Sequence, residues 1–485
     1  MADISEYTKI LERYKSQDQL NSVINSENEC QRAVSALTSI RQDLSSRMKL
    51  GSSSGAWDSL QRILQSSLSI CCSGPDDSSR KWKFVNAVLL LSMNMLSAGK
   101  TTQEYAHSAL GSILLMMLTD KSCPTNALAN ALKIFVNMCA GNDQVKTLLW
   151  QKFLEAYDPN TMRDFTDRLD DSTFAILEIL MAGIMSGSTE RSQKLVSDLQ
   201  GNNLLCGILD RLHSWSESQD KQNFDFAYSI VTTLITHGWF SDAFKACEDT
   251  IDVPSDRQLA MTRVLEGFLV TTEDISPVYG HGLAETLYSD MFCEICKPLC
   301  IQIMKKKIES VQTERLASFQ TLTLECLTAL IGVSADIKDR LIDYHSVEEF
   351  LDLLKKADSM IGRRTLKSGL PTEAGKAYEF PDLKRQLVGI LALLVEDSRT
   401  VQDQIRESGG LPILLSQCNI DDNNPFIREY AILCIKGVLK DNQENQAFVA
   451  SLEAREAVTT DALHEAGYET SIIDGKVSLK KLSKE

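Results

Sequence analysis

The stretch that decides the fold spans residues 387–405 and reads LVGILALLVEDSRTVQDQI, an apolar helix followed by a polar turn and a second amphipathic segment. The same form returns 44 residues later, at 431–449, as AILCIKGVLKDNQENQAFV. Armadillo and HEAT units repeat every ~40–47 residues. The sequence therefore predicts an all-α fold, an armadillo/HEAT-like α-solenoid wound as a right-handed superhelix. Apolar residues of the two copies coincide at Leu387/Ala431, Leu391/Ile435, Leu394/Val438 and Ile405/Val449.

The residues between the apolar runs have the chemistry of helix ends. Gly409-Gly410 permits a left-handed turn, and Pro412 suits the first turn of the helix that follows. Residues 421–425, DDNNP, read as a turn with capping side chains. The form "apolar helix, polar turn, apolar helix" also predicts weaker repeat copies upstream, at 132–149, 176–196 and 326–342.

Four parts follow from this pattern. We expect helical, armadillo-like repeats over 1–356, a loop insertion over 357–379, two strong repeats over 380–455, and a terminal cap with a mobile tail over 456–485. The loop insertion is locally basic and is either a solvated connection or a regulatory docking segment. Its cations are Arg363, Arg364, Lys367 and Lys376.

Charge and cysteine content narrow the class of protein. The chain of 485 residues has 50 Lys and Arg against 66 Asp and Glu, a net charge of −16. Such a surface repels nucleic acid and anionic lipid. The 13 cysteines have no regular spacing, which favours a reducing compartment. The most apolar stretch, 84–96, is shorter than the ~20 residues that cross a bilayer, and no signal peptide is apparent. We therefore expect a cytoplasmic protein without membrane insertion.

The region 380–446 resembles the C-terminal domain of the ataxin-10 family. The resemblance is carried by FPDLKR at 380–385, VQDQ at 401–404, Gly409-Gly410, and above all LSQCNIDDNNPFIRE at 415–429. It implies an armadillo-like cytoplasmic scaffold associated with cytokinesis and, in animals, with neuron survival and neurite outgrowth. Implied partners are cytoskeletal, centrosomal or signalling proteins; the centrosome and midbody are implied locations, and a homo-oligomer stays open.

The chain departs from the repeat pattern at two positions. Tyr430 stands where we expect Trp, and Gly437 stands where armadillo third helices usually carry Asn. A mid-helix glycine costs up to ~1 kcal/mol relative to alanine. It also removes an amide from the concave face, which puts any partner mode that depends on that amide in doubt.

The concave groove is the predicted partner site. Our register places five residues on its surface: Lys133, Asn137, Leu433, Lys436 and Gly437. Nuclear-import adaptors clamp basic peptides there with Trp and Asn four residues apart. Only Trp82 and Asn86 have that spacing here, so an adaptor for basic linear peptides is the alternative function, and core packing is the competing interpretation of Trp82.

Metal and catalytic sites are disfavoured. Cys293, Cys296 and Cys300 would share a helical face, but zinc needs a fourth ligand and usually a second pair of cysteines. The Met93, Met95, Met116, Met117, Cys71 and Cys72 sulfurs could suit copper(I), yet methionine more often fills cores. The six histidines form no motif with acids or nucleophiles. We expect no enzyme activity, no cofactor and no metal.

Overall fold

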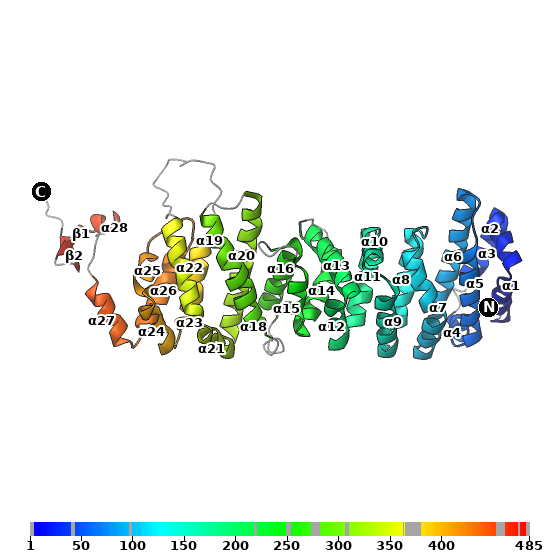
Figure 1. The fold of residues 1–485 in the computed structure, drawn as a ribbon, viewed down its shortest axis with the longest axis horizontal. Helices are drawn as coiled ribbons and strands as arrows, with labels where there is room; N and C mark the ends of the chain where they lie inside the picture. Colours follow the sequence, from blue (N-terminus) through cyan, green and yellow to red (C-terminus); the bar gives the residue numbers. More distant parts are fainter. Residues whose placement is uncertain are drawn as a thin grey trace. The chain divides into compact units, whose positions relative to one another are not determined.

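The computed structural model describes residues 4–39, 44–96, 99–217, 221–248, 254–272, 282–305, 310–361, 363, 380–452, 461–473 and 476–481. The chain forms two compact units, Met1–Leu283 and Ala284–Glu485 (Figure 1). Unit 1 contains helices α1 (Ile4–Arg13), α2 (Gln17–Asn25), α3 (Glu27–Thr38), α4 (Leu44–Gly51), α5 (Ser54–Ser69), α6 (Pro75–Met95), α7 (Lys100–Thr119), α8 (Thr125–Cys139), α9 (Asp143–Ala156), α10 (Pro159–Asp167), α11 (Asp171–Met185), α12 (Thr189–Ser197), α13 (Leu199–Glu217), α14 (Lys221–Thr236), α15 (Phe240–Ala246) and α16 (Asp256–Thr271).

Unit 2 is also helical and ends in a β-hairpin. Its elements, starting at the unit boundary, are α18 (Leu283–Glu285), the π-helical η3 (Thr286–Cys296), α19 (Lys297–Met304), α20 (Ser310–Val333), α21 (Ala335–Asp343), α22 (Ser346–Met360), α23 (Leu383–Val395), α24 (Arg399–Glu407), α25 (Gly410–Ser416), α26 (Ile427–Leu439), α27 (Gln443–Ser451), α28 (Asp461–Glu465), β1 (Tyr468–Ile473) and β2 (Lys476–Lys481).

The predicted repeat form is confirmed in both units. Each predicted copy is an apolar helix followed by a second helix, which is shorter in every pair and only slightly so in the first: α8 and α9, α11 and α12, α20 and α21, α23 and α24, and α26 and α27. The polar turn residue between them is the N-cap of the second helix, and its side chain accepts the N–H three residues on, which satisfies a donor at the helix start. These N-caps are Asn142, Ser188, Ser334, Ser398 and Asn442.

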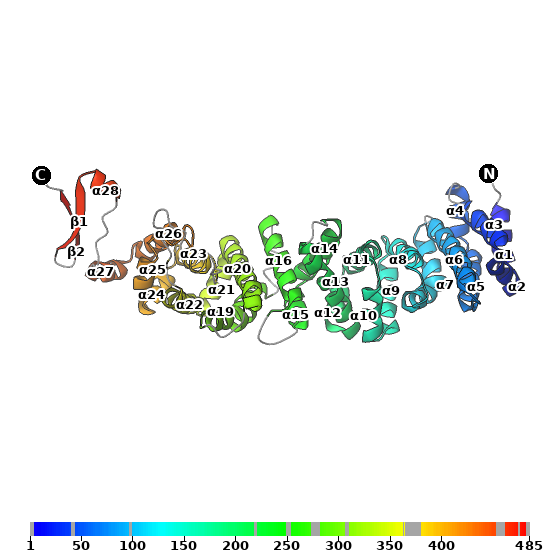
Figure 2. The same ribbon diagram turned by 90° about the horizontal axis from the view of Figure 1, so that it is seen from above.

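The long helices stack on one another in sequence within each unit. In unit 1, α3, α6, α8, α11, α14 and α16 pack successively, and in unit 2, η3, α20, α23 and α26 do the same. Figure 2 shows α8, α11, α14 and α16 along one side of unit 1 and α10, α12 and α15 along the other. This layered packing is the armadillo/HEAT-like α-solenoid that the sequence predicts. The right-handed superhelix stays a prediction.

Glutamine side chains tie one layer to the next in the same way in both units. The Gln103 side chain donates to the carbonyls of Asn137 and Ala140 at the end of α8, at 3.0 and 2.8 Å. The Gln402 side chain donates to the carbonyls of Gly437 and Lys440 at the end of α26, at 2.9 and 3.0 Å. Carbonyls at a helix C-terminus lack partners within the helix, so the glutamine satisfies them from the neighbouring layer.

The predicted domain boundaries stay predictions. The two compact units of the structure meet at a different place, between Leu283 and Ala284. Residues 357–360, which we assigned to the loop insertion, belong to α22. Among its cations, Arg363 is exposed, whereas Arg364, Lys367 and Lys376 lie outside the described residues. The antiparallel hairpin β1–β2 in the terminal segment was not anticipated.

No single helix among the described residues is both long and apolar enough to span a bilayer; only the bent pair 315–332 with 335–343 meets the length and composition criteria together.

Glu178 is a buried carboxyl group in the middle of α11. Its side chain is fully buried, and neither of its oxygens has a hydrogen-bond partner among the described residues. Burial raises the pKa of Glu178 from 4.5 to about 8, against the opposing attraction of Arg211. The folded protein therefore holds this group protonated over a pH range in which the unfolded chain ionises it.

Replacement of Glu178 by glutamine should stabilise the protein at neutral pH. The pKa of Glu178 is higher in the folded protein than in the unfolded chain. The folded state is therefore most stable, with respect to this group, below pH 4.5, where the carboxyl is neutral in both states. Its free energy of unfolding falls as pH rises from 4.5 to about 8, because only the unfolded chain can ionise the group easily. We expect Glu178→Gln to raise the melting temperature more at pH 8 than at pH 5, with a gain of ~1–3 kcal/mol at pH 8. The exposed Glu104→Gln is the control. An equal gain for Glu178→Gln at both pH values would contradict this.

Candidate protein-interaction surface

The loop before α26 is anchored in the core by a buried ion pair. The ammonium of Lys384, at the start of α23, lies 2.7 Å from an oxygen of Asp421, and the two side chains are 1% and 2% exposed. A buried ion pair is tolerated only where further hydrogen bonds complete it. Here the Asn424 side chain donates to Asp421 at 3.0 Å, and the Asn423 backbone N–H donates to it at 3.1 Å.

The same loop also caps α23. The N-cap of α23 is Asp382, whose side chain accepts no capping bond. The Asn424 side-chain oxygen instead accepts the backbone N–H groups of Lys384 and Arg385, at 3.0 and 3.3 Å. The carboxamide thus satisfies two donors at the start of the neighbouring helix. The polar run 421–424 is therefore a clamp between α23 and α26.

The clamp ends by presenting an aromatic side chain to solvent. Phe426 is 72% exposed and has a φ of 63°, in the left-handed region. A bulky residue there is strained, by an amount of ~1–2 kcal/mol. Such strain persists where the surroundings impose it and is common at functional sites.

Phe426 begins an exposed row of side chains along α26. Tyr430 and Leu433 follow at helical spacing, and both are exposed. Tyr430 lies over Gly389 of α23, where an added Cβ would be 3.6 Å from the ring, and the Arg385 guanidinium lies 5.8 Å from the ring centroid. We call Phe426, Tyr430 and Leu433 the groove stripe. It is a contiguous apolar surface with a cation at its edge, as a protein-binding site requires.

The residues that we predicted on the groove have different surroundings. Leu433 and Lys436 are exposed on α26, and Lys133 is exposed on α8 of unit 1. Asn137 is half-buried, and its backbone carbonyl accepts from Gln103. The groove-facing assignments themselves stay predictions.

The surroundings of Gly437 explain why this position has a glycine where the repeat pattern predicts asparagine. An added Cβ there would lie 2.7 Å from Cγ1 of Val395. The close approach of α26 to α23 thus excludes the asparagine that we expected, because no side chain fits. Sequence reasoning missed this contact, since nothing local to Gly437 indicates which helix lies against it.

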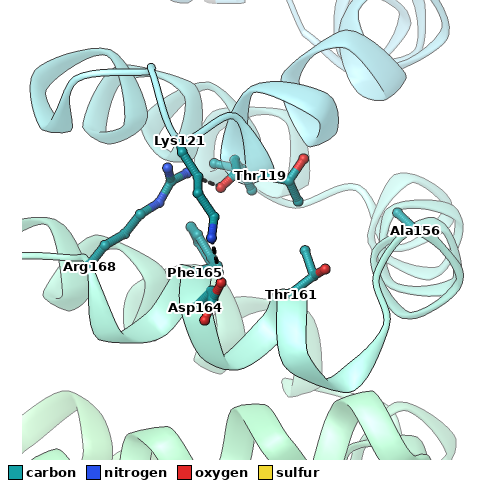
Figure 3. Close-up of a pocket in the computed structure, with 8 residues that line it drawn as sticks. Thr119, Lys121, Ala156, Thr161, Asp164, Phe165 and Arg168 are labelled. Atoms are coloured by element: carbon teal, nitrogen blue, oxygen red, sulfur yellow. Dashed lines mark hydrogen bonds and ion pairs between the residues drawn. The ribbon is translucent and has the colours of Figure 1, made fainter.

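A pocket of about 590 Å³ lies between the end of α7 and α10 (Figure 3). Its charged groups are engaged with each other or with the backbone. Lys121 pairs with Asp164 at 2.9 Å, and Arg168 donates to the carbonyls of Leu118 and Asp120. The Arg168 guanidinium thereby satisfies carbonyls at the C-terminus of α7. The pocket is a gap between packed helices. Its lining side chains do not include a nucleophile placed next to a general base, which a catalytic site of that kind would need.

Several of the sequence candidates for metal or peptide binding are buried, although Cys71 and Met116 are exposed and Cys293 is half-buried. Cys296 and Cys300 are buried, and burial raises the pKa of Cys296 to about 12, which disfavours the thiolate that a metal needs. Within the described part of the chain, no group of three or more potential ligands is placed to hold a metal ion. Trp82 is buried, and the Asn86 side chain accepts from Asn130 at 3.0 Å, so the core interpretation of Trp82 is confirmed.

Comparison with known proteins identifies the region that holds the clamp and the groove stripe. Residues 383–480 match the family model described as the spinocerebellar ataxia type 10 protein domain. The chain carries an ataxin-10 domain. The resemblance that we inferred from residues 380–446 is therefore confirmed, and the ataxin-10 domain extends further, through the hairpin.

Several proteins named ataxin-10 or ataxin-10 homolog are similar to part of this chain. The ataxin-10 homolog of Debaryomyces hansenii is 39% identical over 193 residues, which are 39% of this chain and 38% of that protein. The homolog of Saccharomyces cerevisiae is 50% identical over 100 residues, 21% of this chain and 18% of that protein. Ataxin-10 of Xenopus tropicalis is 24% identical over 56% of this chain and 58% of that protein. The chain spans only 31–38% of the length of the first fungal relatives that it matches.

The solved structures that are similar to this chain have low TM-scores. The structure of SYS-1 is 11% identical with a TM-score of 0.36, covering 90% of this chain and 75% of that chain. A designed armadillo repeat protein in complex with the peptide (KR)4 is 13% identical with a TM-score of 0.25, covering 68% of this chain and 99% of that chain.

Removal of the clamp carboxylate should destabilise the ataxin-10 domain. Asp421→Ala removes the nearer of the two carboxylates beside the buried Lys384 ammonium and leaves only Asp358, 3.8 Å away, so it should cost up to ~3–5 kcal/mol. Urea denaturation would measure the loss. The neighbouring exposed Asp422→Ala is the control and should change stability by less than ~0.5 kcal/mol. If both variants unfold at the wild-type midpoint, the buried ion pair does not hold this loop.

The two glycines of the α23–α26 contact should respond to alanine with opposite signs. Gly437→Ala forces its Cβ into Val395 and should destabilise the protein by ~1–3 kcal/mol. Gly389→Ala meets only the Tyr430 ring at 3.6 Å and should stabilise the helix by up to ~1 kcal/mol. Thermal denaturation of both variants checks this, and stabilisation by Gly437→Ala would show that the helices are further apart.

Proposed function

We propose that this chain is a non-enzymatic scaffold that holds other proteins together during cell division, with cytokinesis as the process it regulates. The ataxin-10 domain supports this proposal, since the family resemblance implies that role. The partners are cytoskeletal, centrosomal or signalling proteins. The site of action is the cytoplasm, including the centrosome and midbody.

The groove stripe is the observation that carries the proposal. The buried residues of α26 pack into the core of the unit. In contrast, the side chains of Phe426, Tyr430 and Leu433 on the same helix are large, apolar and exposed. Aromatic side chains of this kind supply most of the binding energy of protein interfaces. Arg385 lies beside Tyr430 and pairs with Asp382 at 3.0 Å, so its charge is already compensated, and the partner surface that we propose is apolar.

Two further features favour a scaffold over the other functions that we considered. The described cavity has its charged groups engaged in structural contacts, and Trp82 is buried where an import adaptor would expose it. The basic-peptide adaptor therefore has no specific support here.

Phe426→Asn tests the proposal because stability and binding should change in opposite directions. Asparagine tolerates the left-handed conformation, so the variant should be more stable by ~1 kcal/mol. It also removes the exposed ring, so proximity labelling in dividing cells should recover fewer cytoskeletal or centrosomal proteins than with the wild type. A melting curve measures the first effect, and quantitative mass spectrometry measures the second.

His345→Asn is the matched control, since His345 is another exposed residue of unit 2 in the left-handed region, with a φ of 59°. It should leave the set of labelled proteins unchanged. The proposed function would be refuted if the Phe426→Asn variant labelled the same set of proteins as the wild type. Normal division of cells that lack the protein would also refute it.

A further inference from the structure

The outward face of α26 has the residues of a core face. In α23, Val388, Leu391 and Val395 lie on one helical face, and Val395 contacts Gly437 of α26. All three are at most 1% exposed, and α26 packs against α23, so we assign the cover of this face to α26. The 44-residue shift maps them onto Ile432, Ile435 and Leu439. We call these three residues the outer face of α26.

The outer face is not covered by any described helix to the same degree. Ile432 is 50% exposed, and Ile435 and Leu439 are half-buried. The short helix α27 shows the same difference, since Val449 is half-buried while its counterpart Ile405 in α24 is fully buried. Terminal repeats of solenoids need a polar outer surface or a cap. An apolar outer face therefore indicates that another layer belongs on it.

The C-terminal hairpin has an apolar face of its own. The pairing Tyr468↔Lys481, Thr470↔Leu479 and Ile472↔Val477 places these residues on one side of the two strands. Tyr468, Ile472, Val477 and Leu479 are all exposed. A two-stranded hairpin is marginally stable alone and needs packing against a third element.

The hairpin also occupies the sequence position of the next long helix. A further shift of 44 residues carries α26, 427–439, onto 471–483, which overlaps β1 and β2. The same shift carries the clamp pair Lys384 and Asp421 onto Arg428 and Glu465. Arg428 is exposed on α26, and Glu465 is exposed on α28, which packs against β1. The terminal segment thus has the acid that a clamp to α26 needs.

We propose that the hairpin β1–β2 is the cap of the solenoid, with its apolar face on the outer face of α26 and Glu465 beside Arg428. It replaces the third helix of the next repeat. Leu452 and Asp461 are nine residues apart in sequence, a separation that can span up to ~30 Å, so the chain length permits this contact. The cap leaves Phe426 and Tyr430 open, because the 44-residue shift maps Asp382 and Gln386 of α23 onto them. Gln386 faces α20, where the Gln320 side chain donates to it, and so lies away from the face that α26 covers.

Hydrogen exchange of the full-length protein tests the cap, with Ile432→Asp as the disrupting variant. Phe426→Asp is its matched control, since Phe426 is 72% exposed at the start of the same helix and belongs to the groove stripe. We expect Ile432→Asp to speed exchange of the β1 and β2 amides by about tenfold or more, and Phe426→Asp to leave it unchanged. Amides in the core of α23 report that both variants remain folded.

A charge reversal gives an independent readout. Arg428→Glu should speed exchange in the hairpin, and adding Glu465→Arg should restore slow exchange. Equal exchange of β1 and β2 in the wild type, Ile432→Asp and Phe426→Asp overturns the proposal. Hairpin protection that rises with protein concentration also overturns it, because the occupant of the outer face would then be a second copy of the chain.

Discussion

Every layer of this protein depends on the burial of the long helices on two opposite sides. A helix such as α23 contacts α20 before it and α26 after it, so it has apolar residues on both faces. This explains why the helices of the strong repeats are apolar over most of their surface. It also means that no layer is stable by itself, since one face would be exposed until the next layer covers it.

Polar residues set the spacing and the register of these layers. Gln103 and Gln402 bind the last carbonyls of a long helix in the adjacent layer, and Asn424 caps the start of one. The buried pair Lys384–Asp421 fixes the loop that leads into α26. Apolar contacts alone would permit sliding of one helix past another, whereas these bonds are satisfied in one register. The polar run that marks the ataxin-10 domain therefore has a structural role, and the groove stripe follows from where that run ends.

The sequence predicts the layers well because the 44-residue shift and the turn residues are local signals. The N-caps Ser398 and Asn442 stand where the polar turn predicts a helix start. The hairpin was missed although the sequence carries a signal for it, since Asp474-Gly475 is a favoured pair for a hairpin turn and Val477 and Leu479 alternate with polar residues after it. The strain at Phe426 and the contact of Gly437 with Val395 depend on a neighbouring layer, which no local pattern reveals.

We infer that each apolar face in the ataxin-10 domain is covered by the next element of the chain, including the last one. Nuclear Overhauser contacts between methyl groups of the full-length protein, labelled at isoleucine, leucine and valine, test this most directly. We expect contacts from Ile432 to Val477 and Leu479, at the ~5 Å range that packed side chains allow. Hairpin methyl groups that show contacts only within β1 and β2 would contradict it.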